Sequence, residues 1–200
     1  KMQDTPKSLR LQIGIFGRTN VGKSSFLNMV AGQDVAITSP LPGTTTDVVE
    51  KAMEFLPVGP VVFLDTGGMD DTSSLGTDRL RRTRKVFDRS DVTLLVLESG
   101  VWTPFEDEVV REAESRKSPL IVVINKSDVT PPSAEFLTRV REKTSRFLIS
   151  VSTDLSKRDA QVTELKRFLL EVCPDDYLSA PALLGDLMPR GGLAVLIVPI

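Results

Sequence analysis

The sequence contains no histidine and a single cysteine, Cys173, among its 200 residues. Without an imidazole group, these residues supply neither a histidine general base nor a histidine metal ligand. One cysteine forms no internal disulfide, and alone it cannot hold zinc or an iron–sulfur cluster. Any chemistry must therefore rest on carboxylates, hydroxyls, Lys, Arg, backbone groups and bound ions.

Long apolar runs and an excess of positive charge are also missing. PLIVVIN and LAVLIVPI are far shorter than the roughly 20 residues that cross a bilayer, and KMQDTPKSLR lacks a signal-peptide core. We therefore expect a cytoplasmic protein with no membrane partner. The formal net charge of −2 argues against attraction of the whole domain to nucleic acid, which makes a nucleic-acid partner unexpected.

Short apolar runs alternate with amphipathic stretches, a pattern typical of an α/β protein with a largely parallel sheet. The pattern predicts strands at residues 11–16, 46–56, 61–65, 91–98, 119–125 and 146–150, and helices at 23–31, 76–88, 104–117, 132–144 and 159–172. PVGP is short enough to join the second and third strands as an antiparallel hairpin at one sheet edge.

The stretch GRTNVGKS, residues 17–24, has the spacing of a phosphate-binding loop, and it lies between a predicted strand and a predicted helix. In such a loop backbone N–H groups surround the phosphates, Lys23 reaches their oxygens and the Ser24 hydroxyl ligates Mg²⁺. A glycine turn with an exposed lysine is the disfavoured alternative. The expected phosphate contacts are Asn20, Val21, Gly22, Lys23, Ser24 and Ser25.

Two further motifs follow predicted strands. Asp65 in VVFLDTGG ends a strand where a carboxylate can hold the Mg²⁺ shell, and Gly68 follows where the chain can approach a γ-phosphate, although a strand-ending Asp is also a common turn former. In PLIVVINKSD the expected guanine contacts are Asn125, Lys126 and Asp128. A carboxylate there pairs with two guanine N–H donors that adenine lacks, a difference of about 1–3 kcal/mol that favours GTP over ATP.

The order of phosphate loop, PGTTTD, DTGG, NKSD and SVS resembles the translation-factor-related GTPases over residues 11 to 172. The resemblance implies a P-loop NTPase fold of the Ras type: a six-stranded, mostly parallel sheet with one antiparallel edge strand and helices on both faces. It implies GTP hydrolysis to GDP and phosphate with Mg²⁺. It also assigns Thr44 and Thr45 to the nucleotide, with Thr45 on Mg²⁺, and it places the base-closing loop at Ser150, Val151 and Ser152.

Met69 stands where Ras-like relatives carry the glutamine that orients the attacking water. Asn20 together with PGTTTD resembles the potassium-activated subgroup that contains the tRNA-modifying GTPase and Era. That resemblance implies a K⁺ ion on Asn20, which supplies positive charge as an arginine finger does elsewhere, while a loop-stabilising role for Asn20 is the alternative. The expected catalytic residues are Lys23, Thr45, Asn20 and Gly68. Arg18 is interpreted as a surface loop residue rather than as an arginine finger.

The tail LLGDLMPRGGLAVLIVPI, with TPKSLRLQIGIFGRTNVGKSSFLNM and LDTGGMDD, resembles the FeFe-hydrogenase maturation GTPases of the HydF family. The resemblance implies a G domain at residues 8–174, followed at 175–200 by a linker and the truncated start of a dimerisation domain. It places a 4Fe–4S cluster only in an absent C-terminal domain. The implied partners are radical-SAM maturases, the hydrogenase and a second copy, paired through switch regions or the second domain.

Two alternatives to hydrogenase maturation stay open at this stage. One is a GTPase acting in tRNA modification or ribosome assembly. The other is a GTP-dependent interaction module that does not hydrolyse its nucleotide.

Overall fold

The strands form where the sequence has short runs of Val, Ile and Leu. The computed structural model describes residues 10–32, 48–65 and 76–173, without the side chains of 76–82. The strands within these ranges are β1 (Leu11–Phe16), β2 (Val49–Phe55), β3 (Gly59–Asp65), β4 (Val92–Glu98), β5 (Leu120–Asn125) and β6 (Phe147–Ile149). They make one six-stranded sheet in the order β2-β3-β1-β4-β5-β6, in which only the β2–β3 pair is antiparallel.

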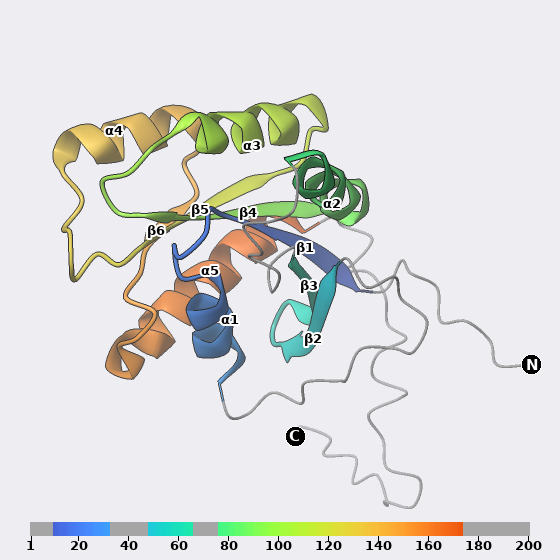
Figure 1. Ribbon diagram of the computed structural model, residues 1–200. Helices are drawn as coiled ribbons and strands as arrows, with labels where there is room; N and C mark the ends of the chain where they lie inside the picture. The colour runs from blue at the N-terminus through green and yellow to red at the C-terminus, as the bar shows by residue number, and fades with distance from the viewer. Residues whose placement is uncertain (1–9, 33–47, 66–75, 174–200) are drawn as a thin grey trace, which may run out of the picture.

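Helices cover both faces of this sheet (Figure 1). On one face lie α1 (Lys23–Ala31) and α5 (Arg158–Val172), the latter preceded by the short 3-10 turn η2 (Leu155–Lys157); on the other lie α2 (Gly76–Arg89), α3 (Pro104–Ser115) and α4 (Ala134–Lys143). Parallel neighbours need crossover connections, and helices supply them here. The predicted fold class is therefore confirmed.

Element ends depart from the predictions where local backbone geometry decides them. Helix α3 stops before Lys117, which adopts a left-handed φ of 55°. Strand β3 begins before Val61, because Pro60 precedes the first residue paired with β1 and its missing N–H therefore costs no bond on that side. Strand β2 begins at Val49, three residues later than predicted, and ends at Phe55, whose carbonyl accepts the turn hydrogen bond from Val58.

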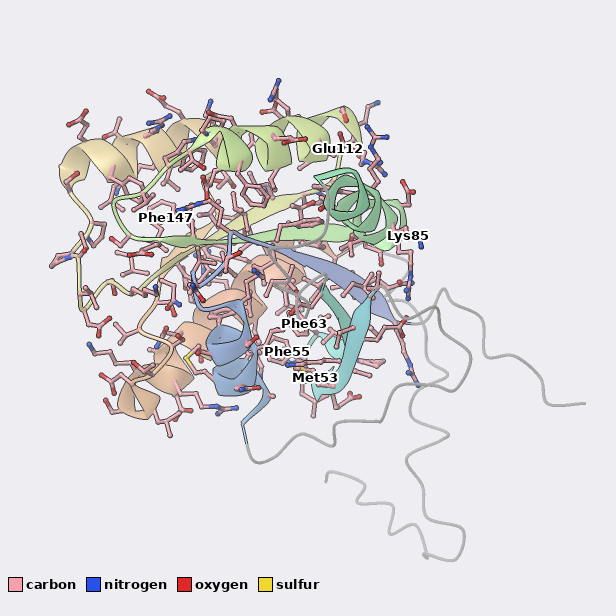
Figure 2. All side chains as sticks on the ribbon, in the orientation of Figure 1. Met53, Phe55, Phe63, Lys85, Glu112 and Phe147 are labelled. Carbon is pink, nitrogen blue, oxygen red and sulfur yellow. The ribbon has the colours of Figure 1, made fainter. Side chains whose placement is uncertain are left out.

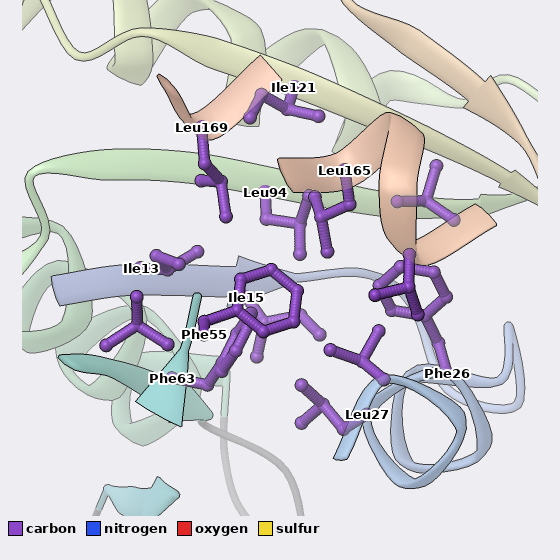
Figure 3. Close-up of a cluster of buried hydrophobic side chains, with 14 of the residues drawn as sticks. Ile13, Ile15, Phe26, Leu27, Phe55, Phe63, Leu94, Ile121, Leu165 and Leu169 are labelled. Atoms are coloured by element: carbon purple, nitrogen blue, oxygen red, sulfur yellow. The ribbon is translucent and has the colours of Figure 1, made fainter. Parts of the chain in front are cut away.

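The core has two halves, one on each face of the sheet. Because side chains alternate along a strand, Ile13 and Ile15 of β1 face α1 and α5, while Phe16 faces the opposite helices. Figure 3 shows the first half, where the β1 isoleucines pack with Leu165 and Leu169 of α5. Both faces of the central strands are thus buried, which explains why their sequences are almost continuously apolar.

Helix α2 is fastened to its neighbours near its end. The ring of Phe87 stacks on Phe16 with centroids 4.0 Å apart, and Arg89 pairs with Glu50 of β2 at 2.6 Å. Glu112 lies on the outer surface of α3, whereas Met53, Phe55 and Phe63 point into the core beneath the hairpin (Figure 2). These two contacts attach the last turn of α2 to β1 and β2.

None of the helices in the described ranges is long and apolar enough to span a bilayer. Helix α5 ends at Val172, close to the predicted end of the G domain at residue 174. Residues 175–200 lie outside the described part of the chain, so the division into two domains stays a prediction.

Candidate functional site

The predicted nucleotide motifs meet at the edge of the sheet where the parallel strands end. The phosphate loop follows β1, Asp65 closes β3, the NKSD motif begins at the last residue of β5, and the loop 150–152 follows β6. In the parallel registers Ile15 lies beside Asp65, and Ile124 lies beside Ile149. In open α/β sheets ligands bind outside the carboxyl ends of the strands, which is where these loops lie.

The phosphate loop has the backbone shape that anion binding needs. Asn20 and Gly22 adopt left-handed φ angles of 64° and 94°, conformations that asparagine and glycine tolerate best. Lys23 Nζ donates to the carbonyl oxygens of Gly17 at 2.8 Å and Arg18 at 3.1 Å, so the ammonium is held by the loop itself. The N-cap of α1 is Gly22, which has no side chain to cap the first-turn N–H groups, and these groups suit a phosphate.

Asn125 joins the phosphate loop to the loop that follows β6, which carries the predicted base-closing residues and is called the base loop below. Its Nδ2 donates to the carbonyl oxygen of Val21 at 2.9 Å, and its Oδ1 accepts from the backbone N–H of Ser152 at 3.2 Å. The side chain is 1% exposed, so both bonds are shielded from water. A Cβ on Gly22 would lie only 2.3 Å from Nδ2, and this close approach explains the glycine. The three predicted loops therefore form one connected unit.

Of the three predicted guanine residues, Asn125 is buried, and the other two, Lys126 and Asp128, lie on the solvent side of that unit. Asp128 is exposed, and Lys126, with a left-handed φ of 57°, pairs with Glu98 at the end of β4 at 3.3 Å. Below them Ser127 donates through both its N–H and its hydroxyl to the carbonyl oxygen of Ser150. An exposed carboxylate above a supported loop suits a base that arrives from solvent.

The loop after β6 is supported from beneath by a residue that the sequence did not indicate. Oε1 of Gln161 on α5 accepts from the N–H of Val151 at 3.1 Å, and the residue is 7% exposed. The Ser150 hydroxyl is buried and has no hydrogen-bond partner among the described residues. Helix α5 thus positions Val151, the middle one of the three predicted base-closing residues.

The residues present fit a magnesium ion bound together with phosphates. Asp65 ends β3 beside the start of the phosphate loop, and Ser24 lies exposed in the first turn of α1. Within the described ranges there is no cluster of three or more acidic or cysteine side chains that could hold a metal ion by protein groups alone. Mg²⁺ binds in this manner to one or two protein oxygens, with phosphates and water completing its shell. Asn20 is exposed in the same loop, as a K⁺ ligand would need to be.

Several predicted site residues lie outside the described part of the chain. They are Thr44, Thr45, Gly68 and Met69.

Arg18 lies in a loop and is partly exposed, as expected, but its side chain also has a buried partner that was not predicted. Its side chain is 28% exposed, and its Nε donates at 2.8 Å to Oε1 of Glu106, a carboxylate that is fully buried. The sequence does carry a signal for Glu106, because TPFE has the capping-box spacing of a helix start. The sequence carries no signal that Glu106 pairs with Arg18, since the two residues are 88 positions apart.

Comparisons with known proteins agree with this geometry. A family model described as 50S ribosome-binding GTPase matches residues 12–126. The tRNA modification GTPase MnmE of Synechococcus sp. (strain JA-2-3B'a(2-13)) is 42% identical over 126 residues, which are 61% of this chain and 26% of that protein. MnmE of Nitrosospira multiformis is 36% identical over 163 residues, 80% of this chain and 34% of that protein.

The chain thus spans about a third or less of these relatives' length. Among solved structures, an Aquifex aeolicus Era variant bound to GDP·AlF₄⁻ matches with a TM-score of 0.61 and 27% identity, covering 82% of this chain and 56% of that one. The chain therefore belongs to the family described as 50S ribosome-binding GTPases, and its domain is a P-loop GTPase domain of the kind that MnmE and Era share.

Proposed function

We propose that this domain binds GTP with Mg²⁺, hydrolyses it to GDP and phosphate, and uses the two nucleotide states as a switch. The observation that carries the proposal is the Asn125 bridge, which ties the phosphate loop to the base loop. A phosphate loop alone is shared by ATPases and GTPases. A phosphate loop joined to an NKSD motif is expected for a nucleotide whose base is guanine.

The chemistry of binding follows from the residues in place. Lys23 and the first-turn N–H groups of α1 neutralise the phosphates, and the helix dipole adds to that attraction. Ser24 and Asp65 would hold Mg²⁺, which supplies positive charge against the phosphate oxygens when it is bound. The Asp128 carboxylate accepts hydrogen bonds from the two guanine N–H donors. Adenine would leave that carboxylate without these bonds, so GTP is preferred.

Hydrolysis in this proposal needs added positive charge at the transferred phosphoryl group. Lys23 supplies part of it, and the residues Thr45 and Gly68 complete the γ-phosphate site by family resemblance. A K⁺ ion held by the Asn20 side-chain carbonyl would supply the remainder, in the place an arginine finger takes in other GTPases. The left-handed backbone of Asn20 offers a second reason for asparagine, so the two roles must be separated.

The test measures GTP hydrolysis in KCl and in NaCl at equal ionic strength. Asn20→Gly keeps the left-handed backbone but removes the amide oxygen, and it is therefore a cleaner variant than Asn20→Ala. We expect KCl to raise the wild-type rate by about tenfold or more, and the glycine variant to lose this stimulation while it still binds GTP. Equal wild-type rates in both salts would remove K⁺ from the mechanism. GTP binding without turnover in either salt would leave a non-hydrolysing interaction module.

The pathway served by the switch has two candidates. The curated relatives are tRNA modification GTPases, and this similarity favours tRNA modification over hydrogenase maturation. Hydrogenase maturation rests on the tail LLGDLMPRGGLAVLIVPI, which lies beyond the residues that the family model matches. In that case residues 8–174 would be the G domain and 175–200 the start of a dimerisation domain, with the cluster-binding part elsewhere in the natural protein.

Complementation separates the two pathways. The full natural protein containing these residues would be expressed in cells that lack their own tRNA modification GTPase, and in cells that lack the GTPase of hydrogenase maturation. Recovery of the modified tRNA nucleoside supports the first pathway, and recovery of hydrogenase activity supports the second. Asp128→Asn is the control in both strains, because it removes the guanine-binding carboxylate and should abolish whichever recovery is seen.

A further inference from the structure

Glu106 presents a buried charge that an ordinary helix cap does not require. It is the third residue of α3, and its Oε2 accepts from the backbone N–H of Thr103 at 2.7 Å and from the Thr103 hydroxyl. This is a capping box, which occurs readily at exposed helix ends. Here the carboxylate is fully buried, and a buried carboxylate needs a charged or strongly hydrogen-bonding partner.

The partner comes from the phosphate loop. Nε of Arg18 donates to the second carboxylate oxygen, Oε1, at 2.8 Å. Nη2 of the same guanidinium is also buried and has no acceptor among the described residues. A buried donor without a partner loses its hydrogen bonds to water, so the pair stabilises the fold less than a fully satisfied pair would. The case for a further role rests on what the Arg18 backbone contacts.

Arg18 is well placed to act on the phosphates through the loop backbone. Its own carbonyl oxygen, with that of Gly17, accepts from Nζ of Lys23. A side chain anchored to α3 fixes the position of the Arg18 carbonyl and so the direction of the ammonium. Gly17 itself packs against β4, since a Cβ there would lie 2.5 Å from the carbonyl oxygen of Val96. The loop has no room to drift toward the sheet, and Glu106 restrains it on the α3 side.

We propose that Glu106 and Arg18 are a positioning pair that couples the start of helix α3 to Lys23 and thereby to the bound phosphates. The inference rests on the proposed GTP binding. It makes the start of α3 a place where a partner contact would alter nucleotide affinity and turnover. Neither residue is assigned to the reacting atoms; both act through the position of the loop.

The chain carries its own reporter for this coupling. Trp102 is the only tryptophan in the sequence, and its Nε1 donates to Asp107 in the first turn of α3 at 2.9 Å. Arg139 of α4 lies over its ring, 5.4 Å from the centroid. Tryptophan emission therefore reports on the start of α3. If the pair couples the two places, GTP binding changes the emission of Trp102, and breaking the pair removes that change.

The first variant is Glu106→Gln, because glutamine also completes a capping box while it removes the negative charge that faces Arg18. The matched control is Ser133→Ala, which removes the cap of α4, where the hydroxyl accepts from Phe136 N–H at 3.1 Å. We expect both to lower the melting temperature. Only Glu106→Gln should weaken GTP affinity, by about tenfold, and lower kcat as well as raise KM.

A double-variant cycle completes the test. Arg18→Gln should reproduce the loss, and the double variant should lose no more than either single one, because both remove the same contact. If Glu106→Gln fails to fold, Arg18→Gln alone still tests whether the pair affects GTP affinity. The inference is refuted if Glu106→Gln behaves as Ser133→Ala does, if the two losses add, or if Trp102 emission responds to GTP equally in wild type and variants. Failure of the wild-type protein to bind GTP would instead overturn the proposed function.

Discussion

The Asn125 bridge gives a prediction whose size follows from the structure. Asn125→Ala removes two hydrogen bonds and leaves the Val21 carbonyl and the Ser152 N–H without their partner in a region shielded from water. Each buried polar group left without a partner costs about 1–3 kcal/mol, and the smaller residue admits some relaxation. We therefore expect the nucleotide-free protein to lose about 2–4 kcal/mol of unfolding free energy.

The assay is urea unfolding of nucleotide-free protein, followed by the fluorescence of Trp102. A loss of this size corresponds to a fall in melting temperature of roughly 4–16 °C for a domain of this length. Asp128→Ala is the matched control from the same motif. Its side chain is exposed, so we expect its stability to change by less than about 0.5 kcal/mol while guanine selectivity is lost. Equal stability of Asn125→Ala and wild type would refute the claim that this side chain holds the loops together.

The remaining predictions concern the two ends of α1 and the base loop. Gly22→Ala places a methyl 2.3 Å from the Asn125 amide at a φ of 94°, so nucleotide binding should be lost in a fluorescent-GDP titration. Arg158→Gln removes a guanidinium that caps two last-turn carbonyls of α1, and should cost about 1–2 kcal/mol in urea unfolding, unlike Asp159→Ala. A serine hydroxyl bonded to Asp154 lowers the pKa of that carboxyl, so its stabilisation holds above about pH 4 and fades as pH falls through the lowered pKa. An Asp154→Asn protein should lack this acid dependence in its melting temperature.

Much of the fold follows from local sequence. The limits of β1 and α1 match the predictions because an apolar run and a phosphate-loop spacing define both ends within a few residues. Lys117 and Pro60 mark where prediction fails, since the first takes a left-handed φ in a helical pattern and the second occupies a strand position that does not need its N–H. Both outcomes depend on neighbours in space, which periodicity cannot show.

The site divides in the same way. The loops that meet at the sheet edge were predictable, because each motif follows a strand and parallel strands end at one edge. The side chains that hold those loops were not. Glu98 contacts Lys126 and Glu106 contacts Arg18 across 28 and 88 positions, and Gln161 contacts the loop after β6 from ten positions away. None of these spacings is a local sequence pattern.

Those supports bear on the free energy of nucleotide binding. The phosphate loop is held against β4 by the tight packing of Gly17, against β5 by Asn125 and against α3 by Glu106. Contacts that hold a loop in its binding shape lower the free energy needed to order it when GTP binds. Because the Lys23 ammonium is aimed by the same loop, its charge also needs no reorganisation as negative charge develops on the transferred phosphoryl group. The distant pairs that prediction missed are therefore the ones that make the predicted motifs effective.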